Sequence, residues 1–210
     1  MCTETGVDLG VDGLFFDAGD LGVDGQDDPW GVIEEAVGLL LERSLPPIVL
    51  GGDHAISYPV VRAFHRKFER LDILHFDAHP DLYHDFDSNP NSHASPFARI
   101  MENGLARRLV QVGIRTATGH QREQAERFGV EMIEMRQLQG SPQIEFEGDV
   151  YVSVDIDGLD PSFAPGVSHP EPGGLSTRQV LDTIQTFQGN LVGADIVEVN
   201  PRKDVNNITS

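Results

Sequence analysis

The chain of 210 residues has the composition of a folded domain, with 39% hydrophobic and 23% charged residues. Its 34 acidic residues outnumber 15 basic ones, and the net charge of -19 disfavours nucleic acid and anionic membranes as partners. A single cysteine, Cys2, excludes an intramolecular disulfide, and no apolar run reaches the roughly 18 residues that would span a bilayer. No signal-peptide pattern is visible, so we expect a soluble cytoplasmic protein with one domain over residues 1–210.

Short apolar runs alternate with amphipathic stretches along the chain. Asp28 and Pro29 are typical of a helix start, and apolar residues recur at helical spacing from Trp30 to Leu41. The elements predicted next, in chain order, are a strand at 48–50, a helix at 60–68, a strand at 71–76, a helix at 96–105, a strand at 109–114, a helix at 121–128, strands at 130–133 and 150–154, a helix at 177–187 and a strand at 191–199. This alternation predicts a mostly parallel sheet with helices on both faces, a three-layer αβα fold.

Acidic residues and histidines follow four of the predicted strands. These strand ends are Gly51 to His54, Asp77 to Asp81, Ser153 to Pro161 and Asp195 to Pro201. Because ligands bind at the carboxyl ends of parallel strands, we expect these segments to converge on one site. Buried carboxylates that converge would repel each other unless positive charge lay between them, which favours bound metal ions. The alternative is an acidic loop cluster with hydrogen-bonded histidines and no metal.

The spacing of the acidic residues supports a metal site. Asp77, His79 and Asp81 alternate with other residues, as do Asp155 and Asp157, so each set leaves an extended backbone on one side. Carboxylate oxygens mixed with imidazole suit Mn²⁺ or a similar first-row ion. Bridging carboxylates could hold two such ions about 3.5–4 Å apart and activate a water molecule near neutral pH.

Three of these segments also resemble the motifs of the ureohydrolases, the family of arginase, agmatinase and their relatives. The motifs are GGDH at 51–54, DAHPD at 77–81 and SVDIDGLDP at 153–161. Similar flanking stretches lie at 92–100, 163–176 and 195–201, and the sequence most resembles the agmatinase branch that includes plant-type arginases. The resemblance implies an arginase-like catalytic domain over residues 1–210, truncated at both ends relative to the family.

The resemblance also implies a ligand set for two Mn²⁺ ions per chain. It assigns one ion to His54, Asp77, Asp81 and Asp155. It assigns the other to Asp77, His79, Asp155 and Asp157, so that Asp77 and Asp155 bridge the two ions.

Three further roles follow from the same resemblance. His93 matches a histidine that shuttles protons to the leaving amine, and Glu198 matches a glutamate that pairs with the substrate guanidinium. Asp157 is a second candidate for the proton transfer. The expected activity is hydrolysis of agmatine or arginine to urea and an amine, with a small cationic guanidino substrate. The resemblance further implies a homo-oligomer, either a trimer or a hexamer.

Several alternatives stay open on the sequence alone. The substrate could be guanidinobutyrate, formiminoglutamate or free guanidine, the last with another metal such as nickel. The chain could be an inactive metal-binding fragment, or an amidohydrolase of acetylated amines with a single zinc ion. His75, inside a predicted strand, is expected in the core or beside the ligands, and His169 is a candidate neighbour of the site.

Overall fold

The computed structural model describes residues 4, 6–8, 10–11, 13 and 15–210, so Cys2 lies outside the described residues. The strands are β1 (Ile48–Leu50), β2 (Asp72–Phe76), β3 (Arg108–Ile114), β4 (Glu131–Glu134), β5 (Glu145–Asp155) and β6 (Gln188–Val197). The α-helices are α1 (Pro29–Glu42), α2 (Ser57–Lys67), α3 (Pro96–Glu102), α4 (Gly119–Phe128) and α5 (Thr177–Thr186). Short 3₁₀ turns are η1 (His54–Ile56), η2 (Met135–Gln137) and η3 (Ile156–Gly158).

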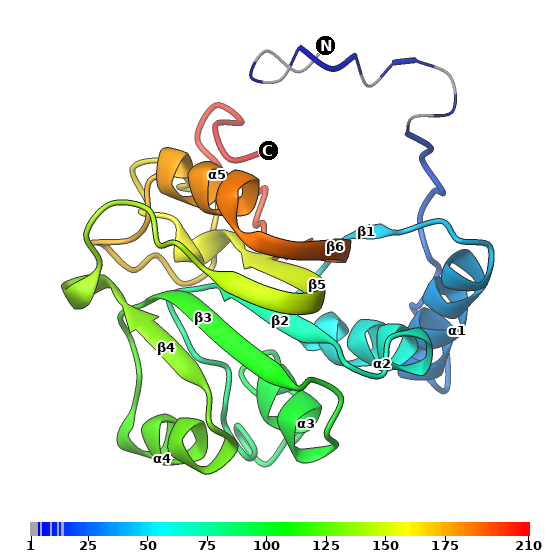
Figure 1. Cartoon of the computed structure of the whole chain (residues 1–210), viewed down its shortest axis with the longest axis horizontal. Coiled ribbons are helices and arrows are strands. Elements are labelled where there is room, and N and C mark those ends of the chain that lie inside the picture. The colour runs from blue at the N-terminus through cyan, green and yellow to red at the C-terminus, as the bar shows by residue number, and fades with distance from the viewer. Residues whose placement is uncertain (1–3, 5, 9, 12, 14) are drawn as a thin grey trace.

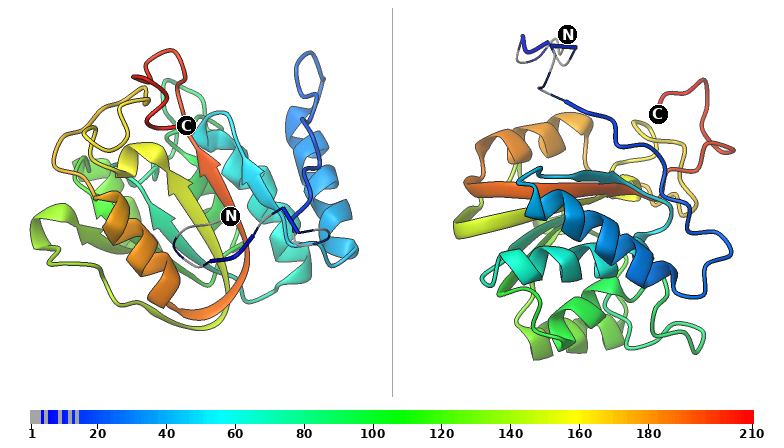
Figure 2. Two further views of the ribbon diagram at one scale, coloured as in Figure 1. Left: turned by 90° about the horizontal axis from the view of Figure 1, so that it is seen from above. Right: turned by 90° about the vertical axis from the view of Figure 1, so that its right-hand side faces the viewer.

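The strands form one sheet in the order β1-β6-β5-β2-β3-β4, and every pairing in it is parallel. Helix α5 covers one face, whereas α2, α3 and α4 cover the other and α1 packs on α2 (Figures 1 and 2). Each face has its own cluster of buried apolar side chains. The predicted three-layer αβα fold is therefore confirmed.

Local sequence explains where most elements begin and end. Thr118 and Ser176 form capping boxes at the starts of α4 and α5, and Gly129 ends α4 in the left-handed conformation. Some predicted bounds differ from the structure. Helix α3 ends at Glu102 instead of 105, because Gly104 adopts a positive φ of 63°. Strand β5 begins five residues earlier than predicted, and β6 ends at Val197 instead of 199.

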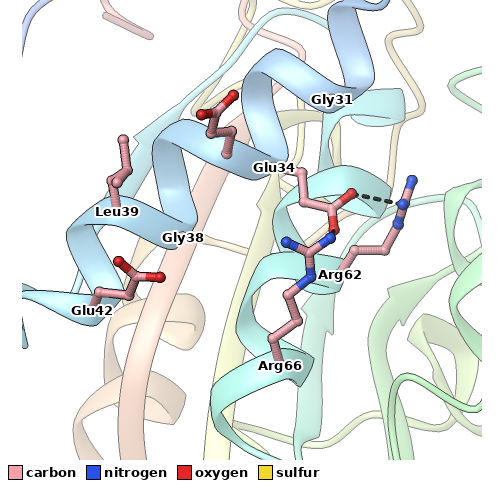
Figure 3. A pocket seen from close by; sticks show the side chains of 8 residues that line it. Gly31, Glu34, Gly38, Leu39, Glu42, Arg62 and Arg66 are labelled. Atoms are coloured by element: carbon pink, nitrogen blue, oxygen red, sulfur yellow. Dashed lines mark ion pairs between the residues drawn. The ribbon is translucent and has the colours of Figure 1, made fainter.

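Helices α1 and α2 border a surface hollow of about 530 Å³ (Figure 3). Glu34 of α1 is only 4% exposed and pairs with Arg62, at 2.8 Å, and with Arg66. These two guanidinium groups compensate a carboxylate that would otherwise be buried without a partner. The hollow includes none of the six candidate metal ligands. Within the described residues, no helix is both long and apolar enough to cross a membrane.

Candidate metal centre

His54 lies in η1, directly after β1, and its ring is fully buried. Its Nδ1 atom is 3.3 Å from Asp77 Oδ2, 3.1 Å from Asp81 Oδ2 and 3.2 Å from Asp155 Oδ2. These carboxylates come from the carboxyl ends of β2 and β5, as a parallel sheet requires. The Nδ1 atom makes no hydrogen bond, although a buried nitrogen normally has a partner.

The other nitrogen of His54 shows which atom carries the proton. Nε2 lies 3.0 Å from Ser153 Oγ, and that hydroxyl donates to Asp195 Oδ1 at 2.6 Å. Asp195 also accepts hydrogen bonds at 2.7 Å from the hydroxyls of Ser57 and Tyr151. Because the Ser153 hydrogen is directed at Asp195, its oxygen accepts from Nε2–H of His54. Burial would lower the pKa of His54, but the carboxylates of Asp155, Asp77 and Asp81 raise it well above its usual value, so Nδ1 also holds a proton when no ion is bound. A divalent ion would displace that proton, and the Nδ1 lone pair would then ligate it while Nε2–H stays on Ser153.

A second group of ligand atoms lies beside the first and shares Asp77 with it. His79 Nδ1 is 3.4 Å from Asp77 Oδ1 and 3.3 Å from Asp157 Oδ2. Asp155 belongs to the first group, and its Oδ1 accepts from the Asp157 N–H at 2.8 Å. The two loops approach so closely that a Cβ on Gly158 would lie 2.8 Å from Asp77 N.

His75 is close enough to His54 and Asp77 to be a third imidazole ligand, but both of its nitrogens have partners. Nε2 lies 2.9 Å from Asp77 Oδ2, and Gln111 Nε2 donates to Nδ1 at 3.0 Å. Gln111 is held in turn by the carbonyl of Pro80. Burial lowers the pKa of His75 to about 4, so the ring is neutral at pH 7 and donates to Asp77. His75 thus orients a candidate ligand, which agrees with its expected place beside the ligands.

The buried carboxylates of the cluster carry negative charge that needs compensation by protons or cations. Burial raises the pKa of Asp155, and burial together with Asp77 raises the pKa of Asp81 to about 6. Burial alone would lower the pKa of His79, but the carboxylates of Asp157 and Asp77 outweigh burial and raise it to about 11. Protons compensate the carboxylates here, and divalent cations would replace them. With its unpaired Nδ1, the oxygen and imidazole donor set fits a pair of first-row divalent ions.

Glu198 follows β6 directly, and its Oε1 accepts a hydrogen bond from the His54 N–H at 3.0 Å. It borders a hollow of about 280 Å³ that is also lined by Ser168 and Asn200. Glu198 has a φ of 66° and Asp81 a φ of 51°. Such conformations of non-glycine residues cost about 1–3 kcal/mol each and are concentrated at functional sites.

His93 is half-buried and lies outside both ligand groups. Its ring stacks on His169 with a centroid distance of 5.9 Å and an interplanar angle of 13°. His169 in turn meets the ring of His79 edge-on at 6.2 Å. The predicted proton shuttle is therefore joined to the second ligand group through His169, which the sequence indicated as a neighbour of the site.

Ser153 and Asp195 lie in the predicted strand-end segments but the motifs assign them no role there, and Arg115 lies outside those segments; all three support the ligands. Ser153 stands two residues before Asp155 on β5 and is in register with Asp195 on β6, so period-2 alternation could have placed both on the ligand side. Arg115 follows β3 and donates to the carbonyl of Asp157 at 2.7 Å. No spacing rule predicts an arginine that binds backbone carbonyls of distant loops.

Comparison with known proteins gives a consistent assignment. Residues 4–210 match the model of the arginase family. The mitochondrial arginase of Medicago truncatula is 58% identical over 182 residues, covering 82% of this chain and 54% of that protein. The structure of the arginase from Medicago truncatula superposes with a TM-score of 0.84 at 56% identity, over 88% of this chain and 62% of that one. The agmatinase of Bacillus subtilis is 34% identical, over 90% of this chain and 68% of the agmatinase.

The plant relatives overturn the predicted cytoplasmic location. Arginase 1 of Arabidopsis thaliana, 53% identical over 96% of this chain and 64% of that protein, is named mitochondrial, as is the Medicago enzyme. The cytoplasmic prediction is therefore wrong. Overall composition carries no record of an organelle address, and the chain spans only 54% to 64% of the length of these two relatives.

Proposed function

The chain belongs to the arginase family, and on that premise we propose that it hydrolyses the guanidinium group of L-arginine to urea and L-ornithine. The relatives that are 48% to 58% identical are named arginases, whereas the agmatinases are 34% to 35% identical. The observation that carries the proposal is the buried, unpaired Nδ1 of His54, which faces three carboxylates.

We infer that the centre binds two Mn²⁺ ions, because its carboxylate and imidazole donors suit a first-row divalent ion. The proposed ligands of one ion are His54, Asp77, Asp81 and Asp155, and those of the other are Asp77, His79 and Asp157. The family resemblance adds Asp155 to the second set as a bridging ligand. When bound, the ions would supply a water nucleophile near neutral pH and stabilise the negative charge that develops on its oxygen. Glu198, fixed by the His54 N–H, would orient the planar guanidinium by accepting paired hydrogen bonds.

Proton transfer completes the reaction. Water adds to the guanidinium carbon, the bond from that carbon to the side-chain nitrogen breaks, and both water protons end on the departing amine. Asp157, on the ligand loop, would receive the first proton. His93, whose ring lies next to His169 and thus near the site, would deliver a proton to the leaving nitrogen.

The decisive test is urea release from Mn²⁺-loaded protein with arginine, agmatine and guanidinobutyrate assayed side by side. We expect wild type to release urea from arginine. Glu198→Gln should bind two ions but show no turnover, and Asp155→Ala should lose both ions. Glu123→Gln, an exposed change on α4, is the matched control and should behave as wild type. Absence of urea from all three substrates in folded protein with two ions would overturn the proposal.

Agmatine is the second candidate substrate, because the agmatinase of Bacillus subtilis matches 90% of the chain. Both substrates carry the guanidinium that Glu198 would bind, and they differ only at the far end. Release of putrescine from agmatine, with no ornithine from arginine, would establish agmatine as the substrate. The mitochondrial names of the plant relatives lead us to expect an organelle location, which imaging of a tagged protein would test. The family resemblance leads us to expect a homo-oligomer, which sedimentation would test.

A further inference from the structure

His79 differs from His54 in how its outward-facing nitrogen is supported. His54 Nε2 is buried against Ser153, whereas the His79 side chain is 23% exposed. Nδ1 of His79 faces Asp77 and Asp157, so Nε2 points away from the ligand group. Glu171 lies on that side, with its Oε1 3.9 Å from Nε2. A carboxylate in this place is what a ligating imidazole commonly uses to hold its orientation.

The backbone of Glu171 is tied to the ligand loop by Arg115. Its carbonyl accepts hydrogen bonds from Arg115 Nε at 2.9 Å and Nη2 at 2.6 Å. The same guanidinium donates to the carbonyls of Asp157, at 2.7 Å, and of Gly158, at 3.2 Å. One side chain therefore sets the distance between the Glu171 turn and a ligand of the second ion.

Asp160 fixes the other end of the same turn. Its Oδ2 accepts hydrogen bonds from the N–H groups of Gly173 at 2.7 Å and Gly174 at 3.1 Å. A Cβ on Gly174 would lie 2.6 Å from Asp160 N and 2.7 Å from Arg115 Nη2, so only glycine allows this approach. Anchors at the Glu171 carbonyl and at Gly173 and Gly174 fix the backbone that carries the Glu171 carboxylate beside His79.

We propose that Glu171 is a positioning residue, which orients His79 from the side opposite the ligand group and strengthens binding of the second ion. This inference rests on the two-ion centre of the proposed function. It assigns to the 168–174 turn a part in metal affinity that is separate from substrate binding. With an ion bound, the Glu171 carboxylate would close the 3.9 Å separation and accept a hydrogen bond from Nε2–H, so that the Nδ1 lone pair is directed at the ion.

The test measures metal binding without turnover. Mn²⁺ is titrated into the metal-free protein by calorimetry, and the spin-coupled two-ion signal is followed by electron paramagnetic resonance. In Glu171→Ala we expect the ion at His79 to lose about 10–100-fold in affinity, while the ion at His54 binds as in wild type. Glu171→Gln, which keeps an acceptor, should recover part of that loss. Glu123→Gln serves as the matched exposed control.

Two measurements keep a local role apart from misfolding and from failure of the proposed function. Thermal unfolding of the metal-free variants should match wild type, since Glu171 is 39% exposed and its anchors are backbone atoms. Wild-type affinity for both ions in Glu171→Ala would overturn the inference, as would equal loss at both ions. If wild type binds two ions but releases no urea, the proposed function fails while the role of Glu171 is still measured.

Discussion

Removal of the Ser153 hydroxyl is expected to weaken the metal centre through His54. Ser153→Ala deletes the acceptor of His54 Nε2–H and one donor to the Asp195 carboxylate, all in a fully buried environment. A neutral hydrogen bond contributes about 0.5–1.5 kcal/mol and one to a charged group about 1.5–3 kcal/mol, so we expect a loss of about 2–4.5 kcal/mol in unfolding free energy. The freed ring can also rotate or change tautomer, which should weaken binding of the ion at His54 about 10–100-fold.

Tyr151→Phe is the matched control for this variant. It also removes a 2.7 Å hydroxyl donor from Asp195, but Tyr151 is not hydrogen-bonded to His54. Urea denaturation of metal-free protein should therefore show a loss of about 1.5–3 kcal/mol in Tyr151→Phe, smaller than in Ser153→Ala by the one bond to His54. Mn²⁺ calorimetry should show weakened binding in Ser153→Ala alone. Equal metal affinity in the two variants would refute the reasoning that Ser153 sets the tautomer of His54.

Three other outcomes follow from the charges and contacts of the site. Despite burial, carboxylate neighbours raise the pKa of His79 to about 11, so Mn²⁺ binding at pH 7 should release protons and should tighten as pH rises. Calorimetric heats of Mn²⁺ binding that do not depend on the ionisation enthalpy of the buffer would contradict this. Hydrogen bonds from Ser162 lower the pKa of Asp160 from 3.8 to about 2, so its contribution to stability is full above pH 3.8 and is lost as pH falls to 2. Thermal melts of metal-free Asp160→Asn should lack this part of the acid dependence. Identical pH profiles in the variant and wild type would exclude a contribution from Asp160. In His93→Ala we expect two bound ions and a turnover about 10²–10⁴-fold lower, with an altered pH–rate profile, and unchanged turnover would remove His93 from the chemistry.

The sequence predicts the fold well because hydrophobic runs of strand length bracket the helices. The completely buried β2 was predicted to within one residue, and the alternation of Asp77 and His79 placed them together. The conformation of Glu198 could not be predicted, because a positive φ in a non-glycine residue depends on tertiary contacts such as its bond to His54. The role of Ser153 needed the register between β5 and β6, which no local pattern contains.

The pairing of β1 with β6 has a consequence for when the centre can form during synthesis. Ile48 lies beside Ala194, and the hydrogen bond from His54 to Glu198 spans 144 residues, so these contacts close a very long chain loop. Loops of this length are entropically costly to close, and a sheet of parallel strands alone has few local contacts to guide it. The ligands after β1 and β2 leave the ribosome long before β6, which stands between β1 and β5 in the sheet. Occupancy of the ligand group that contains His54 therefore reports that β6 has joined the sheet, whereas Asp77, His79 and Asp157 follow β2 and β5, which pair directly with each other.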